Sequence, residues 1–231
     1  MATADDFSAL IGDLSADLRP VRRLAKPAVR ALLWAALVAA FAVYQFSDFA
    51  PEQLGIAPTP DVFVVVGLVA STLTAGLAAI AAFQLSLPDR SAAWTLLPLP
   101  AVILWVAATG IGCLANIGNA GPGMYGATLD EASQCLVFLL QCSLPVSVVL
   151  VLMLRRARPL RPNLVATMAG LAAAGAGASL LILVHVHEST GLDLLLHFAA
   201  FGLVVLVNAA LGGRLLGAGG FKRPPPRTLK A

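Results

Sequence analysis

The stretch from Ser133 to Ser179 reads SQCLVFLLQCSLPVSVVLVLMLRRARPLRPNLVATMAGLAAAGAGAS, and it contains two long apolar runs separated by RRARPLRP. Each run is long enough to cross a bilayer as a helix, for which roughly 20 apolar residues are needed. The arginines and prolines between the runs interrupt the helical pattern. This stretch therefore predicts two membrane-spanning helices joined by a short basic loop.

The same pattern extends over most of the chain. Hydrophobic residues make up 59% of the 231 residues and charged residues only 12%, whereas a soluble domain carries about 25% charged residues. Six apolar runs lie at 29–47, 62–86, 93–115, 132–154, 163–185 and 192–213. We expect an all-α integral membrane protein with three regions: a cytoplasmic segment 1–28, a six-helix transmembrane domain 29–213 and a basic cytoplasmic tail 214–231.

The basic residues predict the orientation, because Lys and Arg accumulate in short cytoplasmic loops. All 15 of them lie in four places. These are the segment up to Arg30, the second connection, the fourth connection, and the segment from Arg214 to the end of the tail. The other three connections carry Asp and Glu as their only charged residues. Both termini are therefore expected in the cytoplasm. The net charge of +3 then reflects this bias, and no direct nucleic-acid binding is expected.

The cytoplasmic segment is predicted to form a short amphipathic helix that Pro20 ends. Its apolar stripe, within an arc of about 80°, consists of Phe7, Leu10, Ile11, Leu14 and Leu18. Asp6, Asp13 and Asp17 flank the stripe, whereas a helix lying on anionic lipid would carry Lys and Arg there. These carboxylates favour a protein groove with basic edges as the binding partner. The alternative is that the helix packs on the chain's own inner loops.

The spans themselves have the composition of packing helices. Small residues recur every four positions at Gly67, Ser71 and Ala75, and again at Gly170, Ala174 and Ala178. Prolines that could kink the spans are Pro98, Pro100 and Pro145. No span carries a charged residue near its middle, which disfavours a small-solute transporter, although a transporter or a non-signalling membrane scaffold stays an alternative. Enzyme signatures such as G-x-S-x-G are absent, so neither catalysis nor a small-molecule substrate is expected.

Potential metal ligands gather toward the predicted outer face. They are Cys113, Cys135, His185, His187 and His197. Cys and His side chains can bind a transition metal, and Cys113 with Cys135 could instead form a disulfide. A lone Cys or His near a helix end is more often a packed or interfacial residue, and these residues come from different helices. No cofactor is therefore predicted firmly, and a transition metal at the outer face stays open.

Two motifs carry a family resemblance. The first has the form D-L-x-P-V, at Asp17, Leu18, Pro20 and Val21. The second has the form S-L-P…R-R…P-L-x-P, at Ser143, Leu144, Pro145, Arg155, Arg156, Pro159, Leu160 and Pro162. With them the chain resembles the NrsF-type family of six-span anti-sigma factors, negative regulators of the extracytoplasmic-function sigma factor F in proteobacteria.

The resemblance implies a function. Such a protein sequesters an extracytoplasmic-function sigma factor at the bacterial inner membrane and releases it on a periplasmic metal or oxidative signal. The partner-binding residues would be Phe7, Leu10, Ile11, Leu14, Asp17, Leu18, Pro20 and Val21, with membrane lipid as the other partner. The family typically carries two outward cysteines, of which Cys135 matches the first and VHVHEST replaces the second. Either Cys113 substitutes, or Cys135 with the histidines senses metal, or the signal differs.

Overall fold

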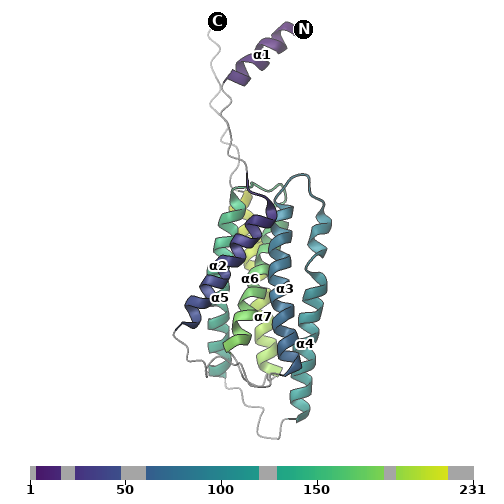
Figure 1. Cartoon of the computed structure of the whole chain (residues 1–231), viewed down its shortest axis with the longest axis vertical. Helices are drawn as coiled ribbons and strands as arrows, with labels where there is room; N and C mark the ends of the chain where they lie inside the picture. Colours follow the sequence, from purple (N-terminus) through teal and green to yellow (C-terminus); the bar gives the residue numbers. More distant parts are fainter. Residues whose placement is uncertain (1–3, 17–23, 48–60, 120–128, 185–190, 218–231) are drawn as a thin grey trace.

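The computed structural model describes residues 4–16, 24–47, 61–119, 129–184 and 191–217. Within these ranges the chain forms helices and no strand (Figure 1). Six helical segments are long and apolar enough to cross a membrane: Pro27–Phe46, Val62–Leu85, Ala92–Ala115, Leu136–Arg155, Pro162–Leu183 and Leu194–Leu216. The predicted fold class, an all-α membrane protein with six spans and a short helix before them, is confirmed.

The helices follow one another up and down the bundle. The N-terminal helix is α1 (Ala4–Ala16), and the first three spans contain α2 (Pro27–Phe46), α3 (Val62–Leu85), and the short 3-10 helix η1 (Ala92–Leu96) followed by α4 (Leu99–Asn119). The last three spans contain α5 (Leu129–Arg155), α6 (Pro162–Val184), and α7 (Gly191–Val207) with the π-helical turn η2 (Asn208–Gly212) and α8 (Gly213–Gly217). Short connections at one end of the bundle join α3 to η1 and α5 to α6 (Figure 1).

The expected prolines have two different effects. Pro98 is fully buried, and it separates η1 from α4, which begins at Leu99. Because proline lacks an N–H and its ring clashes with the preceding turn, it is tolerated at a helix start, where Pro100 also lies. Pro145 lies inside α5, which continues as a helix to Arg155. The third span is therefore interrupted near its start, between η1 and α4, whereas α5 of the fourth span continues as a helix past Pro145.

The central helix of the bundle is α6. In its most apolar window 78% of the residues are buried, compared with 17% in α2. Three glycines of α6 meet three different neighbours: a Cβ on Gly175 would lie 2.9 Å from the Ala75 nitrogen of α3, and one on Gly170 would lie 2.9 Å from the Val205 Cα of α7. A Cβ on Gly177 would come within 2.2 Å of the Ser143 Oγ of α5. The prediction that small residues allow close helix packing is therefore confirmed.

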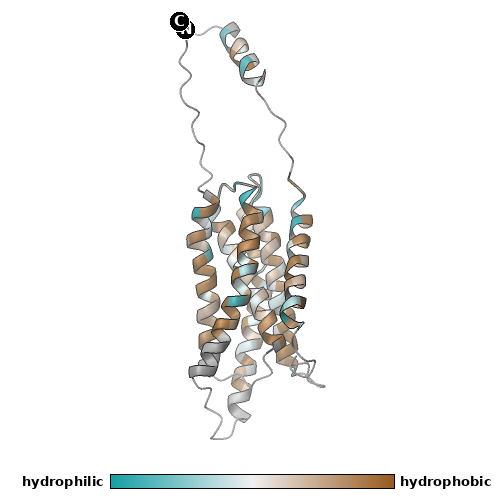
Figure 2. Cartoon of the chain, turned by 90° about the vertical axis from the view of Figure 1, so that its left-hand side faces the viewer, coloured by the Kyte–Doolittle hydropathy of each residue, from teal (hydrophilic) through white to brown (hydrophobic). Residues whose placement is uncertain are grey.

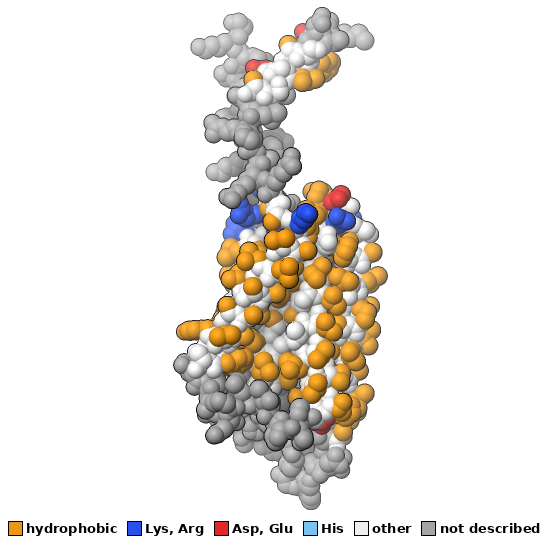
Figure 3. All heavy atoms as spheres, in the orientation of Figure 1, with side chains coloured by type: hydrophobic (Ala, Val, Ile, Leu, Met, Phe, Trp, Pro, Cys, Tyr) orange, Lys and Arg blue, Asp and Glu red, His pale blue; other side chains and the backbone are white. Residues whose placement is uncertain are grey.

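The surface of the bundle divides into an apolar wall and a basic end. Apolar residues cover the sides of the bundle in the ribbon view (Figure 2), and in the space-filling view, which is turned by 90° from it, the side of the bundle is largely orange (Figure 3). Lys and Arg side chains gather at the end of the bundle nearest α1 (Figure 3). This end holds the C-terminal ends of α3 and α5, together with exposed arginines such as Arg155 and Arg161. The distribution matches what the sequence predicts for a cytoplasmic side.

Candidate functional site

The first candidate is the N-terminal helix α1, which lies apart from the bundle (Figure 1). Its apolar residues face solvent, with exposed fractions of 57% for Phe7, 53% for Leu10 and 66% for Ile11. Asp6 and Asp13 are exposed as well. Within the described part of the chain, no side chain covers Phe7, Leu10 or Ile11. The alternative in which α1 packs on the protein's own loops stays open.

The C-terminal part of the predicted binding segment is not tested. The described part of α1 extends to Ala16, so the predicted helix stop at Pro20 lies outside the described residues. Asp17, Leu18, Pro20 and Val21 lie outside the described residues, and so does the side chain of Leu14. Their roles in partner binding stay predictions.

The second feature is Arg30, whose burial the sequence did not reveal. The sequence groups Arg30 with the basic residues that flank the first span, but its exposed fraction is only 7%. Its guanidinium donates a hydrogen bond to the carbonyl oxygen of Met153 on α5, and another of 3.5 Å to the Ser86 Oγ at the end of α3. It also lies 4.6 Å from the ring centroid of Phe83. Arg30 therefore ties the start of α2 to two other helices.

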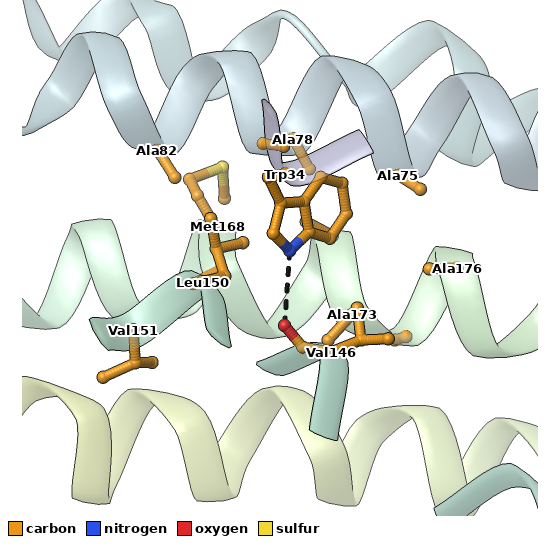
Figure 4. Packing of buried hydrophobic residues seen from close by; sticks show 14 of the residues in the cluster. Trp34, Ala75, Ala78, Ala82, Val146, Leu150, Val151, Met168, Ala173 and Ala176 are labelled. Carbon is orange, nitrogen blue, oxygen red and sulfur yellow. Dashed lines mark hydrogen bonds between the residues drawn. The ribbon is translucent and has the colours of Figure 1, made fainter. Parts of the chain in front are cut away.

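Trp34 makes the next contact along α2. It is 2% exposed, and its Nε1–H donates a 3.3 Å hydrogen bond to the carbonyl oxygen of Val146 on α5. Figure 4 shows the indole between alanines of α3, such as Ala78, and the Val146 carbonyl. Arg30 and Trp34 are four residues apart and so share one face of α2. No pattern in the sequence identifies this contact, because Arg30 resembles the other basic residues that precede the first span.

Polar side chains also meet within the bundle. The Ser147 Oγ of α5 donates a hydrogen bond to the Oδ1 of Asn208, the first residue of the π-helical turn. The Nδ2 of Asn208 donates to the Val204 carbonyl at 2.9 Å. At the α3–α6 interface, the Ser179 Oγ lies 3.0 Å from the Ser71 Oγ. These groups are neutral, and each of them is hydrogen-bonded, which lowers the cost of burying it in a membrane. They fix helix positions and form no charged path across the bundle.

The predicted outer site is only partly described. Cys113 is buried on α4, and His197 is half-buried on α7, where its ring stacks on Phe201 with centroids 6.3 Å apart. Cys135 lies within α5, but its side chain is outside the described part, as are His185 and His187 altogether. Among the residues that the structure describes, no three metal-binding side chains group together. The metal site and the Cys113–Cys135 pairing stay predictions.

Comparison with known protein families identifies a family model that matches most of the chain. A family model described as NrsF, negative regulator of sigma F, matches residues 14–217, which include all six spans. The match contains both motifs on which the resemblance rests, and it begins after Phe7, Leu10 and Ile11. No curated protein and no solved structure gives a match.

Proposed function

The chain belongs to the NrsF family of negative regulators of sigma F, and we propose that it sequesters an extracytoplasmic-function sigma factor at the bacterial inner membrane. As a member of this family it is a negative regulator of a sigma factor, so its partner is a sigma factor. The finer proposal is that α1 makes the contact, that both termini are cytoplasmic, and that a periplasmic metal or oxidative signal releases the partner.

The observation that carries this proposal is the uncovered apolar stripe of α1. Phe7, Leu10 and Ile11 are all more than half exposed on a helix with exposed carboxylates. Burying one such side chain in a partner is worth about 1.5–3 kcal/mol, so three of them can supply much of a binding free energy. The carboxylates beside them favour a groove with basic edges on the sigma factor.

The cytoplasmic placement of α1 is supported by charge. The basic end of the bundle is the end nearest α1 (Figure 3), and Lys and Arg favour the cytoplasmic side of a membrane protein. A soluble sigma factor occurs in the same compartment. The segment 1–28 is thus proposed as the output region and the spans as its anchor.

The proposed contact is tested with the full-length protein in lipid nanodiscs and the purified sigma factor. Ile11→Asp should weaken binding at least about tenfold, because a carboxylate would have to be buried in the apolar groove. Ala9→Asp adds the same charge on the opposite face of α1 and serves as the matched control, for which near-normal affinity is expected. Equal affinities of the two variants would exclude α1 as the binding element.

The proposed release is tested separately at Cys135. In cells that carry a sigma-dependent reporter, Cys135→Ser should reduce the induction of the reporter by metal or oxidant while repression without inducer is unchanged. Cys142→Ser is the control, because Cys142 is buried about two turns further along α5. Normal induction in the Cys135→Ser variant would remove this thiol from the sensing mechanism.

A further inference from the structure

The feature that connects the spans to the output region is α2. This helix follows the segment that contains α1, and in α2 the buried residues are Arg30, Ala31 and Trp34. All three lie in its inner half. The attachment of α2 to the rest of the bundle is therefore concentrated at the end from which the cytoplasmic segment emerges.

The polar contacts of α2 lead mainly to one helix. Arg30 and Trp34 both donate to backbone carbonyls of α5, at Met153 and Val146, about two helical turns apart. We call the hydrogen bonds of Arg30 and Trp34 to the α5 carbonyls the α2–α5 contact.

The Met153 carbonyl is available to Arg30 because α5 ends there. The Ala157 N–H, which would reach Met153 in a continued α-helix, donates instead to the Leu154 carbonyl at 2.9 Å. The last carbonyls of a helix lack intrahelical partners and carry partial negative charge, which favours a cation. Ser86, the C-cap of α3, brings a second helix end to the same guanidinium. Arg30 thus caps α5 from another helix.

The outer half of α2 is held less closely. An apolar pocket opens between α2 and α5, and it is lined by Trp34, Leu37, Val38, Phe41, Pro145, Val146 and Val149. In Figure 1, α2 runs obliquely across α5 instead of parallel to it. A helix that is buried at one end and loosely packed at the other can change its tilt when the buried end moves. The position of α2 therefore depends strongly on the inner part of α5.

We propose that Arg30 and Trp34 are positioning residues through which α5 sets the orientation of α2 and hence the presentation of α1 to the sigma factor. This inference rests on the proposed function for its consequence, although the contact itself is independent of any partner. Helix α5 also carries Cys135 near its outer end, so a displacement of α5 by an outer signal would reach the cytoplasmic segment through two hydrogen-bonded side chains.

The contact is tested by the distance between α2 and α5 in the full-length protein in nanodiscs. Spin-labelled amino acids are placed at Leu33 and Leu152, which are exposed on α2 and α5, so the native cysteines remain. Arg30→Met should broaden and shift the distance distribution. Trp34→Phe, which removes the N–H donor and keeps a smaller aromatic ring, should give a smaller change of the same kind and is the milder variant if the first fails to fold.

The matched controls are Arg90→Met and Trp94→Phe. Arg90 is an exposed arginine of the loop after α3, and Trp94 lies on η1, so neither belongs to the α2–α5 contact. Both variants should keep the distance distribution of the unaltered chain. An unchanged distribution in both Arg30→Met and Trp34→Phe would overturn the proposed contact.

The effect on the sigma factor is measured as sigma-dependent reporter activity in cells that carry each of the same four variants, without inducer. Arg30→Met should raise sigma-dependent reporter activity by about fivefold or more at equal amounts of membrane protein, the usual lower range for coupling between sites. A changed distance with unchanged reporter activity would overturn the positioning role. If the unaltered chain binds no sigma factor, the proposed function is wrong. The distance measurement would still show whether Arg30 and Trp34 hold α2 against α5.

Discussion

At single positions of α6 the space for one methyl group decides what the bundle tolerates. Gly175→Ala would place a Cβ 2.9 Å from both the Ser71 oxygen and the Ala75 nitrogen, which are backbone atoms and cannot rotate away. We expect a loss of about 1–3 kcal/mol in the free energy of unfolding, as is usual for overpacking. Unfolding of the purified protein in mixed micelles with increasing SDS measures it.

The control for this prediction lies on the helix that Gly175 contacts. At Gly76 of α3 an added Cβ meets nothing within 4 Å. Gly76→Ala should therefore leave stability unchanged or raise it slightly, because alanine has the higher helix propensity. A loss of stability equal to that of Gly175→Ala would show that close backbone approach is not the cause.

Two serines on α5 should respond differently to the loss of their hydroxyl. The Ser143 Oγ is buried and has no hydrogen-bond partner within the described part of the chain, whereas the Ser147 Oγ donates to Asn208. Ser143→Ala should be neutral or stabilising, because no bond is lost and a polar group leaves the interior. Ser147→Ala should cost about 1 kcal/mol. The same unfolding titration compares them, and a larger loss for Ser143→Ala would contradict the assignment.

The sequence predicted only some of these residues. A spacing of four finds Gly170, Ala174 and Ala178, because it follows one face of a helix. Gly175 lies on another face, and Gly177 shares the face of Gly170 but is spaced by seven residues and not by four. Helix α6 is also packed by neighbours on several sides. A periodic pattern cannot identify a helix that is contacted all round, since every face then requires small residues.

At the scale of the helix, α1 combines apolar and acidic side chains, and its partner binding should depend on salt. Asp6→Asn together with Asp13→Asn should slow association with the sigma factor and flatten its dependence on ionic strength, because both carboxylates are exposed and would steer the encounter. Stopped-flow or surface binding at several salt concentrations measures the rate. Dissociation should change less than association.

This prediction fails if the charges of α1 play no part in binding. An association rate of the unaltered chain that is independent of salt would contradict a partner groove with basic edges. An acceleration of binding by the double variant would instead indicate an acidic partner surface. The comparison uses the full-length chain, so the spans and their basic end are the same in both proteins.

The helices as units were largely predictable, and their ends less so. Long apolar runs between Pro, Gly and charged residues identify spans, and α3 follows the run at 62–86 to within one residue. The contact of Arg30 was not predictable from such patterns. Its burial depends on where α3 and α5 end in space, and a sequence pattern along α2 does not contain that information.

At the scale of the whole molecule, the charge distribution predicts the orientation, which labelling can test. Leu160→Cys places a thiol in the basic loop between α5 and α6, and Val62→Cys places one at the opposite end of the bundle; both native side chains are exposed. A membrane-impermeant thiol reagent added to spheroplasts should label Val62→Cys and not Leu160→Cys until the membrane is opened. The unaltered chain gives the background from native cysteines, and the reverse labelling pattern would invert the topology.

The close packing of α6 also has an evolutionary consequence. A helix whose glycines meet backbone or buried side chains of three neighbours accepts almost no larger residue, although its position in the bundle keeps it from direct contact with a cytoplasmic partner. A scan of all single substitutions should therefore find α6 less tolerant than α1. In this protein, the most constrained positions and the partner-contacting positions would then be different sets, so intolerance to mutation would identify the scaffold rather than the binding surface.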